Sequence, residues 1–377
     1  MQSVYTEKEA CCGCGTCSDI CALDAITMQP DEEGFLYPVI DPSLCADCGR
    51  CTEICPILRK GHYKEASFPH FYAARHKSKD VLLHSTSGGA FTALSDAILH
   101  QGGVVYGAVF DEAFRVLHAR AETPAQRDRM RFSKYVQSNL RDTFSRIQSD
   151  LRDGRKVLFT GTPCQNAGLR GFLGDSPLAE TLYCCDVICY GIASPLIWED
   201  YKRHLEQEYG GALVTLQFRS KKYAWSRPNS KKGFLLTTQG SPEPQEDNRF
   251  YQLFFQAGTI NRPSCSQCPF TDIYRPSDIT IADYWGIEKY SSSWFSPLGV
   301  SLVLVNSEKG SRLFQQLGED LETEERSFEE AFREQKKLSR PAPLPENRVQ
   351  FWQDYRQLGF DRIFDQYTVN DPSSPIA

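Results

Sequence analysis

The amino-acid sequence predicts a chain in two parts. The first is a small α+β module at the N-terminus, and the second is a larger mixed α/β domain with helices packed on a central sheet. The small module follows from two cysteine motifs in the first 58 residues, which repeat at an interval of 34 residues. The larger domain follows from alternating strand-like and helix-like segments after residue 70. The chain has 377 residues, which is enough for about two or three domains.

Composition and charge narrow the class of protein. Hydrophobic residues make up 41% of the chain and charged residues 24%, as in ordinary soluble globular proteins. The net charge of −6 argues against nucleic acid as a main partner, because phosphate binding needs a basic surface. The sequence shows no run of apolar residues long enough for a transmembrane segment and no export signal. Fifteen cysteines in such a chain therefore predict metal ligation in a reducing cytoplasm.

Two cysteine motifs organise the N-terminal module. Each has the spacing C-x2-C-x2-C-x3-C, and Pro56 follows the second. The spacing is typical of bacterial ferredoxins, in which three cysteines of one motif and the fourth of the other hold each [4Fe–4S] cluster. Structural zinc usually takes separated cysteine pairs, and disulfide frameworks suit small secreted domains, so both alternatives are disfavoured. The predicted ligands are Cys11, Cys14, Cys17 and Cys55 for one cluster, and Cys45, Cys48, Cys51 and Cys21 for the other.

The module is therefore predicted to be ferredoxin-like over residues 1–58. Between the motifs, residues 25–28 and 35–40 read as short strands joined by an acidic turn. Cys12 lies between ligands as a spare thiol. The polar residues 59–69 are predicted to be a linker.

The larger domain is predicted to span residues 70–345, followed by a C-terminal helical tail at 346–377, the last eight or so of which look frayed. Cys184 and Cys185 lie inside a strand pattern and are expected to be buried packing thiols. The predicted strands are 104–110, 156–160, 183–189, 214–219, 233–238 and 302–305, and residues 277–286 are predicted to form a short strand and its exit turn. The predicted helices are 90–99, 195–206, 250–257, 311–317, 328–336 and 350–358.

Two segments of the larger domain could contact a cofactor. Ser87, Gly88 and Gly89 precede the predicted helix at 90–99, where glycines let backbone amides approach a ligand. This loop is either a cradle for a phosphate or a flavin pyrophosphate, or simply a capped helix start. Residues 131–138 either place a cation and an aromatic ring near a cofactor or form a solvated loop.

Four further cysteines could form a third metal site. Cys164 and Cys189 each stand at the end of a predicted strand, where open α/β sheets bind ligands. Cys265 and Cys268 form a separate C-x2-C pair. If the four met above the sheet, they could hold a third iron–sulfur cluster or a zinc ion. Spacing alone leaves both possibilities open, together with that of no metal.

The chain resembles the coenzyme F420 hydrogenase/dehydrogenase beta-subunit family from about residue 71 to residue 367. Eight short segments carry the resemblance; each is weak alone, and their common order makes the signature specific. They are residues 87–91, 102–108, 133–138, 161–165, 189–195, 218–221, 262–268 and 277–286.

The resemblance implies FAD bound in the large domain and a [4Fe–4S] cluster beside it. The implied ligands are the same four cysteines that remain after the ferredoxin motifs are assigned. Two of the matching segments are implied as flavin contacts. The implied site residues are Cys164, Cys189, Cys265 and Cys268 for the cluster, and Ser87, Gly88, Gly89, Lys134, Tyr135, Gln137 and Ser138 for the flavin.

Three positions depart from the family pattern. Tyr190 stands where the family often has His, and Ala224 and Ala282 stand where it usually has Gly. These departures affect the expected pocket, and therefore the substrate, but not the cluster ligands. Arg219, Lys221 and Lys134 could stabilise the negative charge of a flavin or a substrate. Alternatively, each could be only a surface cation.

The function implied is that of an iron–sulfur flavoprotein oxidoreductase. FAD would exchange hydride with a two-electron small-molecule carrier, either F420-like or another donor. Three [4Fe–4S] clusters would then pass single electrons to a partner protein or a second substrate. Two alternatives remain, namely an electron-input subunit that is active only with a separately encoded catalytic partner, and a non-catalytic iron–sulfur sensor or scaffold. No Gly-x-Gly-x-x-Gly motif is present, so a conventional NAD site is not supported.

Overall fold

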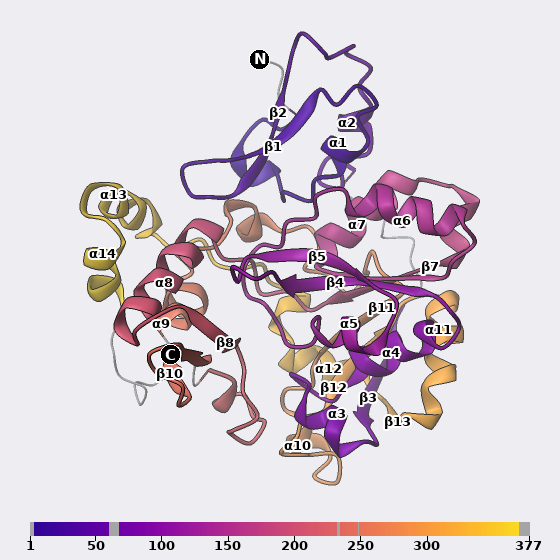
Figure 1. Cartoon of the computed structure of the whole chain (residues 1–377). Helices are drawn as coiled ribbons and strands as arrows, with labels where there is room; N and C mark the ends of the chain where they lie inside the picture. Colours follow the sequence, from indigo (N-terminus) through magenta and orange to yellow (C-terminus); the bar gives the residue numbers. More distant parts are fainter. Residues whose placement is uncertain (1–3, 60–67, 232–233, 248, 369–377) are drawn as a thin grey trace.

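An eight-stranded mixed sheet forms the centre of the large domain in the computed structural model, which describes residues 4–59, 68–231, 234–247 and 249–368 (Figure 1). The strand order is β13-β3-β12-β11-β7-β6-β4-β5. Strands β3, β4, β6, β7 and β11 run in one direction, and β5, β12 and β13 run in the other. The strands are β3 (His70–His76), β4 (Val104–Phe110), β5 (Val116–Ala121), β6 (Val157–Gly161), β7 (Leu182–Val187), β11 (Ile279–Asp283), β12 (Ser301–Val305) and β13 (Leu321–Arg326).

Helices cover both faces of this sheet, as the predicted fold class requires. Alternate strand residues point to opposite faces. Val105 and Cys185 pack with α4 and α11, whereas Val104 and Cys184 pack with α6 and α7. Cys184 and Cys185 are 2% and 1% exposed, which confirms that they are buried. The helices of this domain are α3 (Lys79–Leu83), α4 (Ala90–Leu99), α5 (Pro124–Asp128), α6 (Thr143–Arg152), α7 (Pro163–Leu173), α10 (Ile287–Tyr290), α11 (Glu308–Gln315) and α12 (Phe328–Glu334).

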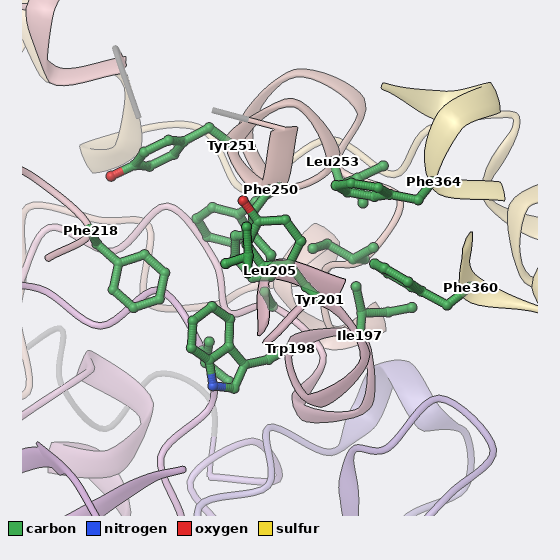
Figure 2. Packing of buried hydrophobic residues seen from close by; sticks show 14 of the residues in the cluster. Ile197, Trp198, Tyr201, Leu205, Phe218, Phe250, Tyr251, Leu253, Phe360 and Phe364 are labelled. Atoms are coloured by element: carbon green, nitrogen blue, oxygen red, sulfur yellow. The ribbon is translucent and has the colours of Figure 1, made fainter. Parts of the chain in front are cut away.

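A second, aromatic core lies beside the sheet. Trp198 and Tyr201 of one helix pack with Phe218, Phe250 and Phe364 (Figure 2). The predicted strands at 214–219 and 233–238 are present as β8 and β9, which pair antiparallel. The elements around this core are α8 (Pro195–Glu208), β8 (Leu213–Gln217), β9 (Phe234–Thr238), β10 (Gln245–Asp247), α9 (Arg249–Tyr251) with a π-helix (Gln252–Ala257), α13 (Arg348–Leu358) and α14 (Phe360–Tyr367).

The N-terminal module repeats one small unit twice. Strands β1 (Ile26–Pro30) and β2 (Leu36–Ile40) pair antiparallel, as predicted. Helices α1 (Thr16–Asp19) and α2 (Arg50–Glu53) each begin after a glycine in the left-handed region, with φ of 73° and 74°. Most of the predicted linker, residues 60–67, and the frayed end of the tail, residues 369–377, lie outside the described residues.

The N-terminal module contacts the large domain at α7 and α6 (Figure 1). The Asp19 carboxylate accepts hydrogen bonds from the backbone N–H groups of Phe144 and Ser145, and so caps α6. Glu33 forms an ion pair with Arg348 near the other end of the chain. Within the described part of the chain, no helix combines the length and apolarity that crossing a membrane requires.

Candidate redox site

Four cysteines from three separate segments line one cavity in the large domain. Cys164 lies at the start of α7, directly after β6, and Cys189 follows β7. Because β6 and β7 are parallel neighbours, their carboxyl ends meet at one edge of the sheet. Cys265 and Cys268 reach the same cavity from a short 3-10 helix, Pro263–Gln267, and its end. The cavity encloses about 500 Å³ of empty space, part of it open to solvent.

The four sulfurs of this cavity act on one another electrostatically. Burial raises the pKa of the Cys189 thiol well above its usual value, and the neighbouring charges of Cys265, Cys164 and Cys268 raise it further. Four thiolates could therefore coexist here only around a strongly positive centre, which a bound metal centre would supply. The donor set thus fits the third site that the sequence predicts.

The described residues contain no group of three or more His, Cys, Asp or Glu side chains that could hold a metal ion. A single ion needs its ligands within one coordination sphere. The thiolates around a [4Fe–4S] cluster each bind a different iron, so they lie further apart than the ligands of a single ion.

A second cavity lies in the N-terminal module and is lined by Cys11, Cys14, Cys17 and Cys55. Burial raises the pKa of Cys17 well above its usual value, and the other three cysteines raise it further. The fourth cysteine of the second motif thus joins three of the first, which is the crossed grouping expected of a ferredoxin. We call this the inner cavity.

The remaining motif cysteines lie further toward solvent. Burial raises the pKa of Cys51, and the charges of Cys48 and Cys45 raise it further, so these three act on one another. Cys48 is exposed, whereas Cys21 is half-buried. We call Cys45, Cys48 and Cys51 the outer cysteine group.

Cys12 joins the two cavities, and the sequence assigned it no role. It is 8% exposed and lines both the large-domain cavity and the inner cavity. Interactions with the thiols of Cys14, in the module, and Cys164, in the large domain, raise the pKa of Cys12 well above its usual value. The two predicted ligand sets are therefore neighbours, separated by one buried side chain.

A third, polar cavity lies at the same edge of the sheet, with about 390 Å³ of empty space, part of it open to solvent. Ser85 and Thr86 line it from one side, and Arg219 and Lys221 line it from the other. Arg219 forms an ion pair with Asp283, the last residue of β11. Burial lowers the pKa of Lys221 to about 8, although the charge of Asp283 opposes this effect.

Trp225 also lines the polar cavity and is part of an ordered wall. It stacks on Trp285 with ring centroids 5.0 Å apart and planes inclined by 11°. Its indole N–H donates to the Asp283 carboxylate at 2.7 Å. The cavity thus has a rigid aromatic side as well as hydroxyl groups and cations.

The predicted glycine loop lies beside the polar cavity. Lys221 Nζ lies 3.3 Å from the Ser87 carbonyl oxygen, to which it donates. Gly88 is held against β3 and β12, where a Cβ would lie 2.5 Å from the Ala74 carbonyl oxygen. Gly89 begins α4 with a φ of 84°. Close packing thus accounts for Gly88, and backbone conformation accounts for Gly89.

The second predicted segment divides between several surroundings. Lys134 donates to two backbone carbonyls, those of Arg129 and Arg131. Tyr135 packs among the aromatic rings of the second core. Gln137 donates to the Gly13 carbonyl at 3.3 Å, and so reaches the module instead of the polar cavity.

Ser138 lies near the large-domain cavity. Its hydroxyl accepts a hydrogen bond of 2.9 Å from Gln165, which directly follows Cys164. The structure thus brings all four cysteines of the third site together and places residues 87–89 beside the polar cavity. The end of the segment 134–138 faces the cysteine sites.

Comparisons with known proteins agree with this architecture. Residues 154–331 match the family described as the C terminus of the coenzyme F420 hydrogenase/dehydrogenase beta subunit, and residues 10–57 match the 4Fe–4S dicluster domain. None of the curated proteins compared with the chain matches it.

Among solved structures, the fold is similar to that of a chain in a xenon-derivatised F420-reducing [NiFe] hydrogenase complex from Methanosarcina barkeri. The TM-score is 0.50 and the sequence identity 16%, over 79% of this chain and 94% of the other. The two family matches thus relate the chain to iron–sulfur dicluster domains and to the C terminus of the coenzyme F420 hydrogenase/dehydrogenase beta subunit, and the solved structure shows a shared fold. These matches, over residues 10–57 and residues 154–331, confirm the predicted resemblance.

Proposed function

We propose that the chain is a flavin- and iron–sulfur-dependent oxidoreductase that passes electrons between a two-electron carrier and a partner protein or second substrate. The observation that carries this proposal is the succession of cavities at one edge of the sheet. The polar cavity and the large-domain cavity both lie there, and the latter adjoins the inner cavity through Cys12. The exposed Cys48 marks the outer cysteine group as the place where electrons would leave or enter.

The polar cavity is proposed to hold FAD. Lys221 and Arg219 would bind its anionic groups, with the hydroxyls of Ser85 and Thr86 as hydrogen-bond partners. Trp225 would offer an apolar face to a planar ring. When bound, FAD supplies hydride chemistry on one side and single-electron chemistry on the other. The chain's part is to hold it, exclude water and set its potential.

The large-domain cavity is proposed to hold a [4Fe–4S] cluster on Cys164, Cys189, Cys265 and Cys268. The module is proposed to hold two more, on the cysteines of the inner cavity and on the outer cysteine group with Cys21. The carrier is proposed to be an F420-like molecule or another hydride donor. Of the positions that depart from the family pattern, Ala224 lines the polar cavity and Tyr190 lines the large-domain cavity.

A second candidate function is an electron-input subunit that is active only with a separately encoded catalytic partner. The exposure of Cys48 favours it, because an exposed terminal site suits transfer between proteins. Addition of candidate partners to the purified chain separates the two functions. Activity that appears only with a partner supports the second.

The test is anaerobic purification with iron, sulfide, zinc and flavin counted per chain. We expect about twelve irons and about one FAD, from three four-iron clusters. About eight irons per chain together with zinc would contradict a cluster in the large domain. Iron without flavin would favour a non-catalytic iron–sulfur sensor or scaffold. Stopped-flow mixing with reduced F420, NADH and NADPH in turn then identifies the carrier through loss of flavin absorbance.

A further inference from the structure

Arg262 brings a positive charge into the space between two cysteine sites. Its side chain is 1% exposed. Nε donates to the Cys11 carbonyl at 2.8 Å, Nη1 to Gln137 Oε1 at 2.9 Å, and Nη2 to the Leu36 carbonyl at 3.0 Å. Nη2 also lies 3.6 Å from the Cys11 sulfur. The guanidinium thus binds the module directly, at Cys11 and Leu36, and binds Gln137 of the large domain.

The oxygen acceptors around this guanidinium are all neutral. Within the described residues, no carboxylate forms an ion pair with Arg262, although the buried Arg127, Arg249 and Arg275 each pair with an aspartate. A buried charge without a counter-charge is strongly unfavourable. The negative charge that compensates Arg262 must therefore come from another kind of group.

The guanidinium also lies 5.4 Å from the Phe35 ring centroid and 4.2 Å from that of Tyr37, but these rings carry no net charge. The sulfur sites are therefore the remaining source of net negative charge. The guanidinium touches the sulfur of Cys11, which lines the inner cavity. Its charge also acts on Cys12, which lines both cavities, and on Cys265 in the large-domain cavity. A thiolate-ligated [4Fe–4S] cluster has a net negative charge that increases on reduction, and net charge is one determinant of its potential.

We propose that Arg262 is a positioning residue that supplies the fixed counter-charge of the cluster on Cys11, Cys14, Cys17 and Cys55. The inference rests on the proposed function, because it requires that cluster. A fixed positive charge beside the cluster stabilises its reduced form and raises its potential. Arginine suits this role because its fork holds the charge in place through several hydrogen bonds at once.

The test compares Arg262→Gln and Arg262→Lys with the wild type by anaerobic potentiometric titration followed by EPR spectroscopy. At a fixed potential, Arg262→Gln should lower the reduced-to-oxidised ratio of the inner cluster at least tenfold, a shift of ~59 mV for one electron. Arg262→Lys keeps the charge and should show a smaller shift. The reduction potential of the cluster on the outer cysteine group and Cys21 should not change. The matched control is Arg127→Lys, a buried arginine that lines none of the three cavities and should change no potential.

Full iron content with an unchanged inner potential in Arg262→Gln would overturn the inference, as would an equal shift in all three clusters. If Arg262→Gln does not fold, Arg262→Lys decides. A near-wild-type potential then supports the role of charge, and a tenfold or larger drop contradicts it. Wild-type protein without a cluster in the module would refute the proposed function itself, whereas a loaded variant with unchanged potentials refutes only the role of Arg262.

Discussion

Gly168 of α7 and Cys14 of the N-terminal module approach so closely that a Cβ on the glycine would lie 3.1 Å from the cysteine Sγ. The same Cβ would collide with the Thr16 hydroxyl. Gly168→Ala should therefore overpack the junction and destabilise the docked protein by about 1–3 kcal/mol. We expect a lower thermal midpoint and reduced iron content, measured on anaerobically purified protein.

Gly318→Ala is the control for this substitution, because a Cβ at that position meets nothing within 4 Å. It should leave the midpoint and the iron content at wild-type values. A Gly168→Ala protein with the wild-type midpoint would show that the junction is looser than described.

Cys265→Ser should remove the large-domain cluster and spare the other two. Iron should fall from about twelve to about eight per chain, because serine is a poor replacement for a thiolate ligand. Cys12→Ser is the control, since Cys12 lines the same cavity but is not a predicted ligand. It should keep about twelve irons. Equal loss from both variants would mean that Cys12 is itself a ligand.

Lys221→Gln should weaken FAD binding at the polar cavity at least tenfold, about 1.4 kcal/mol, because it removes a half-buried cation from the proposed phosphate contacts. The measurement is the dissociation constant from flavin fluorescence with deflavinated protein. Lys222→Gln is the matched control, because the neighbouring Lys222 is exposed and pairs with Glu246. Identical affinities in the two variants would place the flavin elsewhere.

His118 should make stability depend on pH. Burial lowers its pKa to about 4, the Thr160 carbonyl that accepts from Nε2 opposes this, and Nδ1 has no hydrogen-bond partner among the described residues. The unfolded chain takes up the proton near pH 6.5 and the folded chain only near pH 4. Stability from this group is therefore complete above about pH 6.5 and is lost as the pH falls toward 4, by about 3 kcal/mol at most.

His118→Gln removes this titration. The difference in thermal midpoint between wild type and variant should shrink steadily from about pH 7 to about pH 5. A difference that stays constant over this range would contradict the buried neutral histidine.

The sequence predicted the elements whose pattern is strong. The helix at 90–99 and the strand at 104–110 appear with the expected bounds, because each combines a glycine signal with regular apolar spacing. Strand β3 was not predicted, since charged and polar residues interrupt its apolar run and its burial comes from β12 and β13, distant in sequence. Helix α7 was also missed, although the Thr162 to Gln165 capping box marks its start.

The candidate site shows the same division. Cysteine spacing predicted that Cys11, Cys14, Cys17 and Cys55 lie together, because a [4Fe–4S] cluster demands that grouping, and their role as ligands stays a prediction. The roles of Cys12 and Arg262 depend on how the module docks, and no local pattern encodes that arrangement. The polar cavity likewise joins residues 85–86 to residues 219–230, which only the folded sheet brings together.

The ion pair between Glu33 and Arg348 has a consequence for synthesis. The ribosome synthesises the first 58 residues long before it reaches position 348. The N-terminal module therefore lacks its ion pair with Arg348 until synthesis of the chain is nearly finished. Truncation before position 348 should thus leave an N-terminal module whose attachment to the large domain lacks the ion pair of Glu33.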